Sequence, residues 1–297
     1  LKTLHYHQEN VHDFAWFADK RYYVLKGEVE LPHSKNKVTT WAMFTNNEAK
    51  LWEKSIEYLN DATYYYSLWN GDYPYKHVTA VDGSISAGGG MEYPNITVIG
   101  ESYSAFALEQ VIVHEVGHNW FYGILGSNER QHAWMDEGLN TFTENRYTET
   151  KYPEMDLGGI GLPKGIMAKS GLNVYGPRGM YDLGYLFNAR RNYDQPIETA
   201  SQDFTPTNYG AIVYGKTGIG MDYMLAYLGD NLFNKCMHAY FDKWKFKHPQ
   251  PDDLRDVFQS VTGKDLSWFF DDYIKTTKKI DYKIAAIKTN ETGEFKV

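Results

Sequence analysis

The chain has 297 residues, enough for one large domain or two smaller ones with a sizeable core. With 42% hydrophobic and 23% charged residues, its composition is that of a globular protein and excludes an intrinsically disordered chain. The formal net charge of −8 argues against nucleic acid as the main partner, because phosphate binding requires clustered Lys and Arg.

The sequence contains no apolar run approaching the roughly 18 residues of a transmembrane segment. The opening LKTLHYHQEN has neither an initiator Met nor the basic-then-apolar pattern of a signal peptide, so we expect a segment of a longer protein. The single cysteine, Cys236, cannot form an internal disulfide and is expected to be a buried apolar residue. The compartment therefore stays open, although the aromatic, cysteine-poor composition favours a bacterial periplasm or cell envelope over the cytoplasm.

The first hundred residues are expected to form strands around one helix. Residues 22–32 and 37–45 carry β-branched and aromatic side chains near a period of two, which is typical of strands. Residues 47–71 have apolar side chains at helical spacing and end in Gly71, a plausible helix stop. Residues 75–100 return to a strand pattern.

The rest of the chain is expected to be mainly helical. A helix is predicted over 104–122, capped by Ser104 and ended by Gly123, and a second over about 133–147. The glycine-rich residues 155–185 favour a long irregular connection. Helical patterns resume after residue 208, including one that starts at Pro251 and stops at Gly263. The sum is an α+β architecture, with a small mixed sheet followed by a mostly helical lobe.

The run HEVGH, residues 114–118, carries the chemistry of the chain. On an α-helix, positions i and i+4 share a face, so His114 and His118 can direct their imidazoles at one metal ion. Glu115 projects about 100° away from His114 and can reach a water on the metal rather than the metal itself. The alternative to a metal site is that the pattern arose by chance and that both histidines are hydrogen-bonded residues of the core.

A catalytic zinc ion needs three protein ligands and one open position. Glu137, on the second predicted helix, is the candidate third ligand, because a turn after Gly123 can return its carboxylate to the histidines. Glu144 lies two helical turns further along the same face, and it is expected either to accept the second N–H of a ligating histidine or to be an exposed helix carboxylate.

HEVGH followed at this distance by WMDEG resembles the gluzincin metallopeptidases, and more narrowly the M1 aminopeptidase family. That family carries a Gly-x-Met-Glu-Asn strand before the zinc helix. Here GGGMEYP, residues 88–94, offers Gly89, Gly90, Met91 and Glu92, with Tyr93 where Asn is usual. An edge strand beside the metal can bind a peptide backbone, and a carboxylate at its end can pair with the α-amine of a substrate.

The resemblance also implies a transition-state tyrosine in a Tyr-x-Lys-Gly segment. The matching residue is Tyr214, although Thr217 separates Lys216 from Gly218 here, and Tyr209 is the substitute candidate. The resemblance further implies a thermolysin-like catalytic domain over residues 21–297. Residues 1–20 would then be the remnant strand of a missing N-terminal β domain of the same polypeptide.

The resulting hypothesis is a zinc aminopeptidase with one Zn²⁺ per chain. Glu115 would act as general base, Tyr214 would stabilise the oxyanion, and Glu92 would bind the free N-terminus of a peptide substrate. An endopeptidase or an epoxide hydrolase of the same fold remains an alternative, although Glu92 has no evident role in cutting internal bonds. A non-catalytic zinc-binding module is the other alternative.

Overall fold

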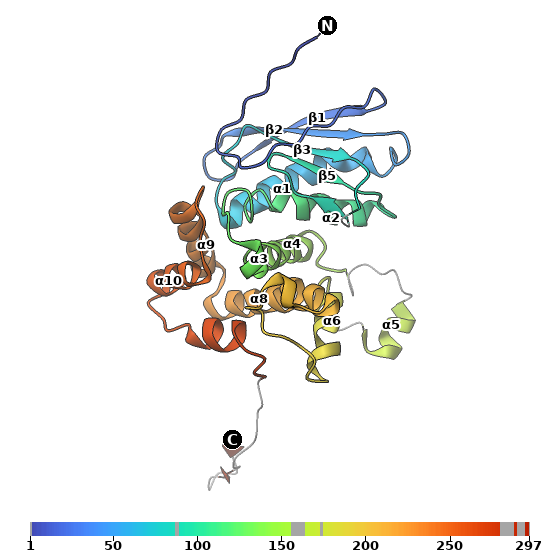
Figure 1. Ribbon diagram of the computed structural model, residues 1–297. Helices are drawn as coiled ribbons and strands as arrows, with labels where there is room; N and C mark the ends of the chain where they lie inside the picture. Colours follow the sequence, from blue (N-terminus) through green and yellow to red (C-terminus); the bar gives the residue numbers. More distant parts are fainter. Residues whose placement is uncertain are drawn as a thin grey trace.

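A β-sheet forms one end of the molecule, and helices fill the rest (Figure 1). The computed structural model describes residues 2–86, 89–155, 164–172 and 175–279, together with the short strands at 288–289 and 295–296. The first hundred residues build the sheet end of the molecule, and most of the later described residues form the helices (Figure 1).

The main sheet has five strands and is mixed. β1 and β2 are antiparallel, β3 and β5 continue the sheet in parallel with β2, and β4 is antiparallel to β5. In spatial order, the strands are β1 (Tyr23–Glu30), β2 (Lys37–Phe44), β3 (His77–Asp82), β5 (Ile96–Ile99) and β4 (Gly90–Met91). β4 therefore forms an edge of the sheet.

One face of this sheet is covered by α1 (Ser55–Asn70), which follows the short 3₁₀ helix η1 (Trp52–Lys54). The side chains of β2 alternate between buried and partly exposed, as expected for a strand with one face against a core. Gly71 ends α1 with a φ of 128°, a conformation that L side chains rarely adopt.

The helical part begins with α2 (Ala105–Gly117), which packs against α1 and lies under the sheet (Figure 1). The later elements are, in chain order, α3 (Glu129–His132), η2 (Ala133–Met135), α4 (Glu137–Lys151), α5 (Lys164–Ser170), α6 (Gly179–Ala189), η5 (Ser201–Asp203), α7 (Pro206–Asn208), η6 (Tyr209–Lys216), α8 (Thr217–Leu228), α9 (Asp230–Trp244), α10 (Pro251–Thr262), η7 (Trp268–Ile274), and the strands β6 (Lys288–Thr289) and β7 (Phe295–Lys296). Of these, η6 and η7 are π-helical.

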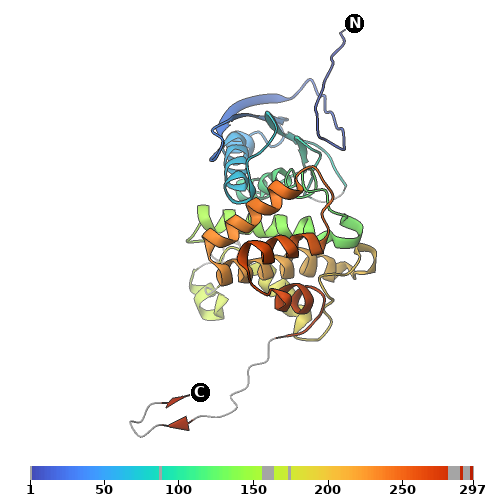
Figure 2. The ribbon, with the colours of Figure 1, turned by 90° about the vertical axis from the view of Figure 1, so that its left-hand side faces the viewer.

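Aromatic side chains fill the centre of the molecule. Trp120 is fully buried between the rings of Tyr66 and Tyr73, with ring centroids 5.4 and 5.2 Å away. α9 packs against α1, and α10 packs against α9, so these two helices cover one side of the core (Figure 2). Much of the high aromatic content of the sequence is therefore used in packing.

The small mixed sheet followed by a mostly helical part confirms the predicted architecture, and Cys236 is buried as expected. The described part of the chain contains no helix that is both long and apolar enough to span a membrane.

Several element boundaries were predicted wrongly. A strand was expected within residues 1–20, but residues 2–20 contain none, and the first strand begins at Tyr23. The division of the chain into a domain remnant and a catalytic domain stays a prediction. The connection predicted over 155–185 contains α5 and the start of α6, with 156–163 and 173–174 outside the described residues. α2 ends at Gly117, not near Gly123, because the backbone tightens from residue 118 onward.

Candidate metal centre

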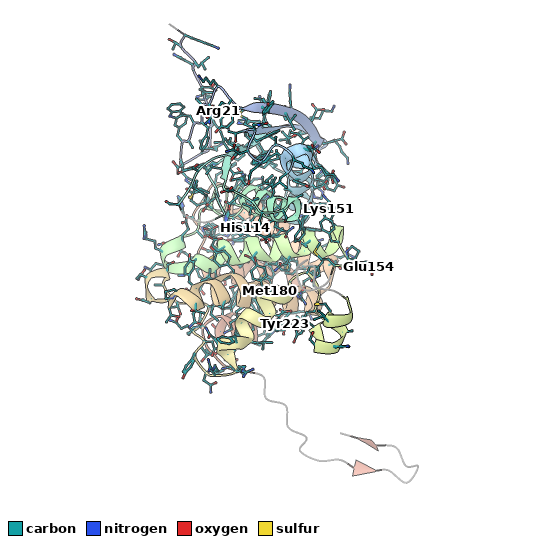
Figure 3. All side chains as sticks on the ribbon, turned by 90° about the vertical axis from the view of Figure 1, so that its right-hand side faces the viewer. Arg21, His114, Lys151, Glu154, Met180 and Tyr223 are labelled. Atoms are coloured by element: carbon teal, nitrogen blue, oxygen red, sulfur yellow. The ribbon has the colours of Figure 1, made fainter. Side chains whose placement is uncertain are left out.

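The last turn of the helix α2 carries residues 114–117 of the HEVGH run, and His118 is the C-terminal cap of this helix. Its N-terminus is capped by Ser104, whose hydroxyl accepts a hydrogen bond from the backbone N–H of Ala107 at 3.1 Å. His114 and His118, one turn apart, both direct Nε2 to the same side, and the two nitrogens are 3.1 Å apart. Figure 3 shows His114 in the middle of the molecule, between the sheet and the lower helices.

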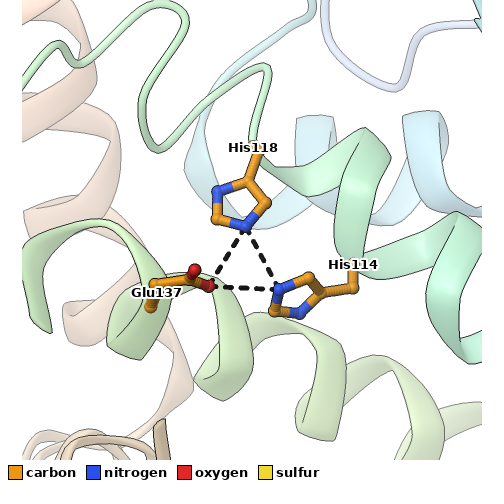
Figure 4. A group of neighbouring side chains, drawn as sticks. All are labelled: His114, His118 and Glu137. Atoms are coloured by element: carbon orange, nitrogen blue, oxygen red, sulfur yellow. Dashed lines mark hydrogen bonds and ion pairs between the residues drawn. The ribbon is translucent and has the colours of Figure 1, made fainter. Parts of the chain in front are cut away.

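The third corner of this group is Glu137, the first residue of α4. Its Oε2 lies 3.2 Å from Nε2 of His114 and 3.2 Å from Nε2 of His118, so the three atoms form a nearly equilateral triangle (Figure 4). Burial opposes ionisation of Glu137, but the positive charge of the two imidazoles outweighs it and holds the pKa of the carboxyl well below its usual range.

The dimensions of this donor triangle fit a tetrahedral metal ion. Tetrahedral ligands with bonds of ~2.0–2.1 Å to zinc lie about 3.3–3.4 Å from one another, close to the observed 3.1–3.2 Å. Two imidazoles and one carboxylate are also donors that suit zinc. The described residues contain a second group, Glu92, His118 and Asp136, whose ligand atoms lie within 4.8 Å of one another.

The other ring nitrogen of each histidine has a carboxylate partner. Nδ1 of His114 lies 3.0 Å from Oε2 of Glu144. Nδ1 of His118 lies 2.7 Å from Oδ1 of Asp136 and 3.0 Å from the carbonyl oxygen of Phe121. Such partners fix the tautomer that leaves Nε2 free for a metal and raise the basicity of the ligand.

Glu115 lies beside the donor triangle but is not part of it. Its carboxylate is buried, and burial raises its pKa to about 7. The backbone of Gly90, in β4, packs directly on this side chain, and a Cβ at residue 90 would overlap the carboxylate. A glycine is therefore required at this point of close approach.

A cavity of about 550 Å³ opens over the triangle. It is lined by the three residues of the triangle, by Gly89, Gly90, Met91 and Glu92 from one wall, and by Gln110, Val111, Glu115, Glu144, Tyr181 and Tyr214 from the others. The residues that the sequence singled out for this centre thus border one cavity, except the substitute candidate Tyr209. Gly88, the first glycine of GGGMEYP, lies outside the described residues.

Tyr214 reaches the cavity from the π-helix η6. Its ring stacks on that of His114 at a centroid distance of 6.2 Å, and the ring of Tyr209 meets it edge-on at 6.0 Å. Burial, followed by the negative charge of Glu137, raises the pKa of the Tyr214 hydroxyl far above its usual value. The phenol therefore stays protonated at neutral pH and is available as a hydrogen-bond donor.

A buried hydrogen-bond network holds α2 against α1 and α4. The side chain of Asn140 donates to the carbonyl oxygen of His114 at 2.8 Å, and Tyr66 donates to the Asn140 side chain at 2.8 Å. A Cβ at Gly117, inside HEVGH, would overlap both Asn140 and Tyr66. The glycine therefore permits the close approach that brings Glu137 and Glu144 to the histidines.

Sequence reasoning missed several residues of this centre. The position of Asp136 directly before Glu137 could have suggested that it lies near the metal centre. Its contact with His118, however, depends on how the chain enters α4. Asn140 and Tyr66 are separated by 74 positions and give no local pattern. Gln110 and Val111 sit one turn before His114 on the same helix face and are predictable from helical spacing, whereas Tyr181, on α6, is not.

Two aminopeptidases are similar to this chain in sequence. Probable aminopeptidase 2 of Sulfurisphaera tokodaii is 22% identical over 248 residues, which are 80% of this chain and 29% of that protein. Aminopeptidase N of Lactococcus lactis is 24% identical over 182 residues, 60% of this chain and 20% of that protein. The chain therefore spans less than a third of the length of these two relatives.

Solved structures share the fold. An M1 zinc metallopeptidase from Deinococcus radiodurans superposes with a TM-score of 0.63 at 15% identity, covering 88% of this chain and 53% of that one. Aminopeptidase A of Legionella pneumophila superposes with a TM-score of 0.63 at 14% identity, covering 86% of this chain and 28% of that one.

The sequence profile of the Peptidase family M1 domain matches residues 52–273, which include the whole donor triangle, Glu115 and Tyr214. Since this match extends over most of the 297 residues, the chain belongs to peptidase family M1.

Proposed function

We propose that the chain is the catalytic part of a zinc-dependent aminopeptidase, which removes residues from the free N-terminus of peptides. One observation carries the proposal. Glu115, a buried carboxylate outside the donor triangle, lies between that triangle and the glycine backbone of an edge strand that leads to a second carboxylate, Glu92. This combination supplies a base, a surface for a peptide backbone and an anion for its α-amine.

In this proposal, His114, His118 and Glu137 hold one zinc ion per chain. When bound, zinc lowers the pKa of a water molecule toward 7 and polarises the scissile carbonyl group. Glu115 takes the proton of the attacking water and passes it to the leaving amine. Glu144 and Asp136 keep the imidazoles oriented through their Nδ1 atoms.

The substrate is proposed to lie along β4, which has β5 on one side only among the described strands. Such an edge strand can add a peptide strand through backbone hydrogen bonds. Glu92, next to β4, would pair with the α-amine, whose usual pKa near 8 leaves it largely protonated at neutral pH. This pairing would restrict cleavage to the first peptide bond.

The decisive test compares peptides with free and acetylated N-termini. We expect hydrolysis of the free peptides only, and a Glu92→Gln variant that loses about 10- to 100-fold in kcat/KM, the value of a hydrogen bond to a charged group. The exposed Glu101→Gln is the control and should behave as the unaltered protein. Equal cleavage of both peptide series would favour an endopeptidase and remove Glu92 from its proposed role.

Tyr214 is proposed to donate a hydrogen bond to the oxyanion that develops on the scissile carbonyl. Tyr214→Phe is expected to keep its zinc and to lose about 10²- to 10³-fold in kcat, because one oxyanion donor is removed. Zinc content and steady-state kinetics measure both effects. Tyr209→Phe is the matched comparison, and a larger loss in that variant would transfer the role to Tyr209.

The contact of Gly90 with Glu115 gives a further expected result. Gly90→Ala forces the Glu115 carboxylate to move, and displacement of a catalytic group by about 1 Å can cost on the order of 10²-fold in rate. Gly165→Ala is the control, because residue 165 is exposed and a Cβ there would meet no atom within 4 Å. Similar kcat/KM values for the two variants would show that the contact with Glu115 is unimportant.

A further domain of the same polypeptide is proposed to pack near the N-terminal segment. Four large apolar side chains of this segment are exposed, namely Leu4 (59%), Tyr6 (76%), Phe14 (71%) and Trp16 (71%). Clustered exposed apolar groups are typical of surfaces that contact another protein unit. The greater length of the relatives agrees with such a domain.

A further inference from the structure

Lys216, two residues after Tyr214, is a buried lysine outside the metal centre. Its side chain is 1% exposed, and its Nζ donates a hydrogen bond to the carbonyl oxygen of Thr276 at 3.1 Å. The ammonium group also faces the rings of Tyr185 and Tyr273, at 5.8 and 5.2 Å from their centroids. Lysines are almost never fully buried unless they are paired, and here the partners are a carbonyl oxygen and two aromatic rings.

The same residue is held a second time through its backbone. The hydroxyl of Tyr273 donates to the carbonyl oxygen of Lys216 at 2.8 Å. The ring of Tyr273 reaches this point because Gly220 has no Cβ, and a Cβ there would overlap the ring. Both partners of Lys216, Thr276 and Tyr273, belong to residues 268–279, which we call the C-terminal strap.

The C-terminal strap is itself attached to the rest of the molecule. The backbone N–H of Glu198 donates to the carbonyl oxygen of Ile274 at 3.0 Å. Nζ of Lys279 forms an ion pair of 3.1 Å with Asp194, whose carboxylate is almost fully buried. The strap is thus anchored on the segment before α7 and provides a fixed partner for Lys216.

Lys216 and Tyr214 lie on opposite sides of η6. Residues two apart in a helix are separated by about half a turn, so Tyr214 faces the cavity while Lys216 faces the strap. π-helical turns are rare and occur frequently at functional sites. Lys216 connects η6 to the C-terminal strap by two hydrogen bonds, one through its side chain and one through its backbone carbonyl group.

We propose that Lys216 is a positioning residue, which fixes η6 on the C-terminal strap and thereby holds the Tyr214 ring against His114 with its hydroxyl in the cavity. This inference rests on the proposed role of Tyr214. Burial of the Lys216 amine destabilises the folded state, since burial lowers the pKa of this amine to about 8 despite the opposing charge of Asp194. Retaining a costly buried amine is consistent with a function in positioning rather than in stability.

The test uses Lys216→Met, which keeps the length and apolar character of the side chain but removes the donor. Lys275→Met is the control, because Lys275 lies in the same strap and forms an exposed ion pair with Asp271. In Lys216→Met, we expect faster amide hydrogen exchange in peptides covering residues 209–216, with an unchanged or higher Tm and full zinc content. The control should change none of these quantities.

Kinetics provide the second measurement. Lys216→Met is expected to lower kcat ~10-fold with KM nearly unchanged, less than the about 10²- to 10³-fold loss on removing the Tyr214 hydroxyl itself. In the Tyr214→Phe background, Lys216→Met should cause no further loss, because both changes remove the same contribution. A merely structural role would instead lower Tm and leave kcat per folded site intact.

Two results would overturn the inference. Unchanged exchange in residues 209–216 of Lys216→Met would show that the Lys216 side chain does not hold η6, whatever the activity. Additive losses in the double variant would show that Lys216 acts independently of Tyr214. A wild-type protein that hydrolyses no peptide would contradict the proposed function, and hydrogen exchange alone would then decide whether Lys216 fixes η6.

Discussion

Replacing Glu115 with Gln is expected to lower kcat by about 10²- to 10⁴-fold while zinc stays bound, because the variant keeps the shape of the side chain and loses the proton acceptor. Zinc retention is expected because Glu115 lies outside the donor triangle formed by His114, His118 and Glu137. Metal analysis and steady-state kinetics on the same preparation measure the two quantities together.

Glu101 carries an exposed carboxylate, so Glu101→Gln controls for the loss of one negative charge. A Glu115→Gln variant with normal kcat would remove the general base from the proposed mechanism. A variant that loses both zinc and activity would instead assign Glu115 to the metal ligands.

Glu137→Gln is expected to weaken zinc binding more than about 100-fold. Mutating a residue that only orients a metal ligand costs up to about 100-fold in metal affinity, and the loss of a direct ligand should cost more. The amide is neutral, so the charge that faces both Nε2 atoms at 3.2 Å is lost. Activity should fall with zinc content and recover only in part at high zinc concentration. Competition with a chelator gives the affinity, and metal analysis gives the stoichiometry.

Glu144→Gln is the graded comparison, because Glu144 contacts only Nδ1 of His114 within the centre. Its expected loss is about 10- to 100-fold in zinc affinity. If Glu137→Gln bound zinc as tightly as the unaltered protein, the third ligand would lie elsewhere, and the group of Glu92, His118 and Asp136 would be the next to examine.

Local patterns predicted the parts of this centre that lie within one element. The spacing of His114 and His118 and the cap at Ser104 depend only on helix geometry, so the histidines could be assigned before any tertiary contact was known. The glycines that lead into β4 likewise form a visible sequence motif, although the motif does not predict the contact of Gly90 with Glu115.

The features that sequence could not supply depend on how distant elements pack. Asn140 meets Gly117 and Tyr66 because three helices converge, and no spacing rule within one helix predicts such a meeting. The start of α6, which contributes Tyr181, falls within the predicted irregular connection over 155–185, because glycines interrupt its apolar pattern. Its packing against η6 compensates for that low intrinsic helix propensity.

The arrangement around the two imidazoles also has a consequence for folding. Four carboxylates, those of Glu115, Asp136, Glu137 and Glu144, are largely shielded from solvent around His114 and His118. Repulsion among these carboxylates, in a place where water cannot solvate their charge, opposes the packing of α4 on α2, and burial accordingly raises the pKa of Glu115 and of Asp136. A divalent cation that binds only the folded chain offsets this repulsion and adds its binding free energy to the stability of the fold. If the proposed zinc site is occupied in the folded protein, the ion would therefore belong to its interior, as the aromatic rings around the histidine helix do.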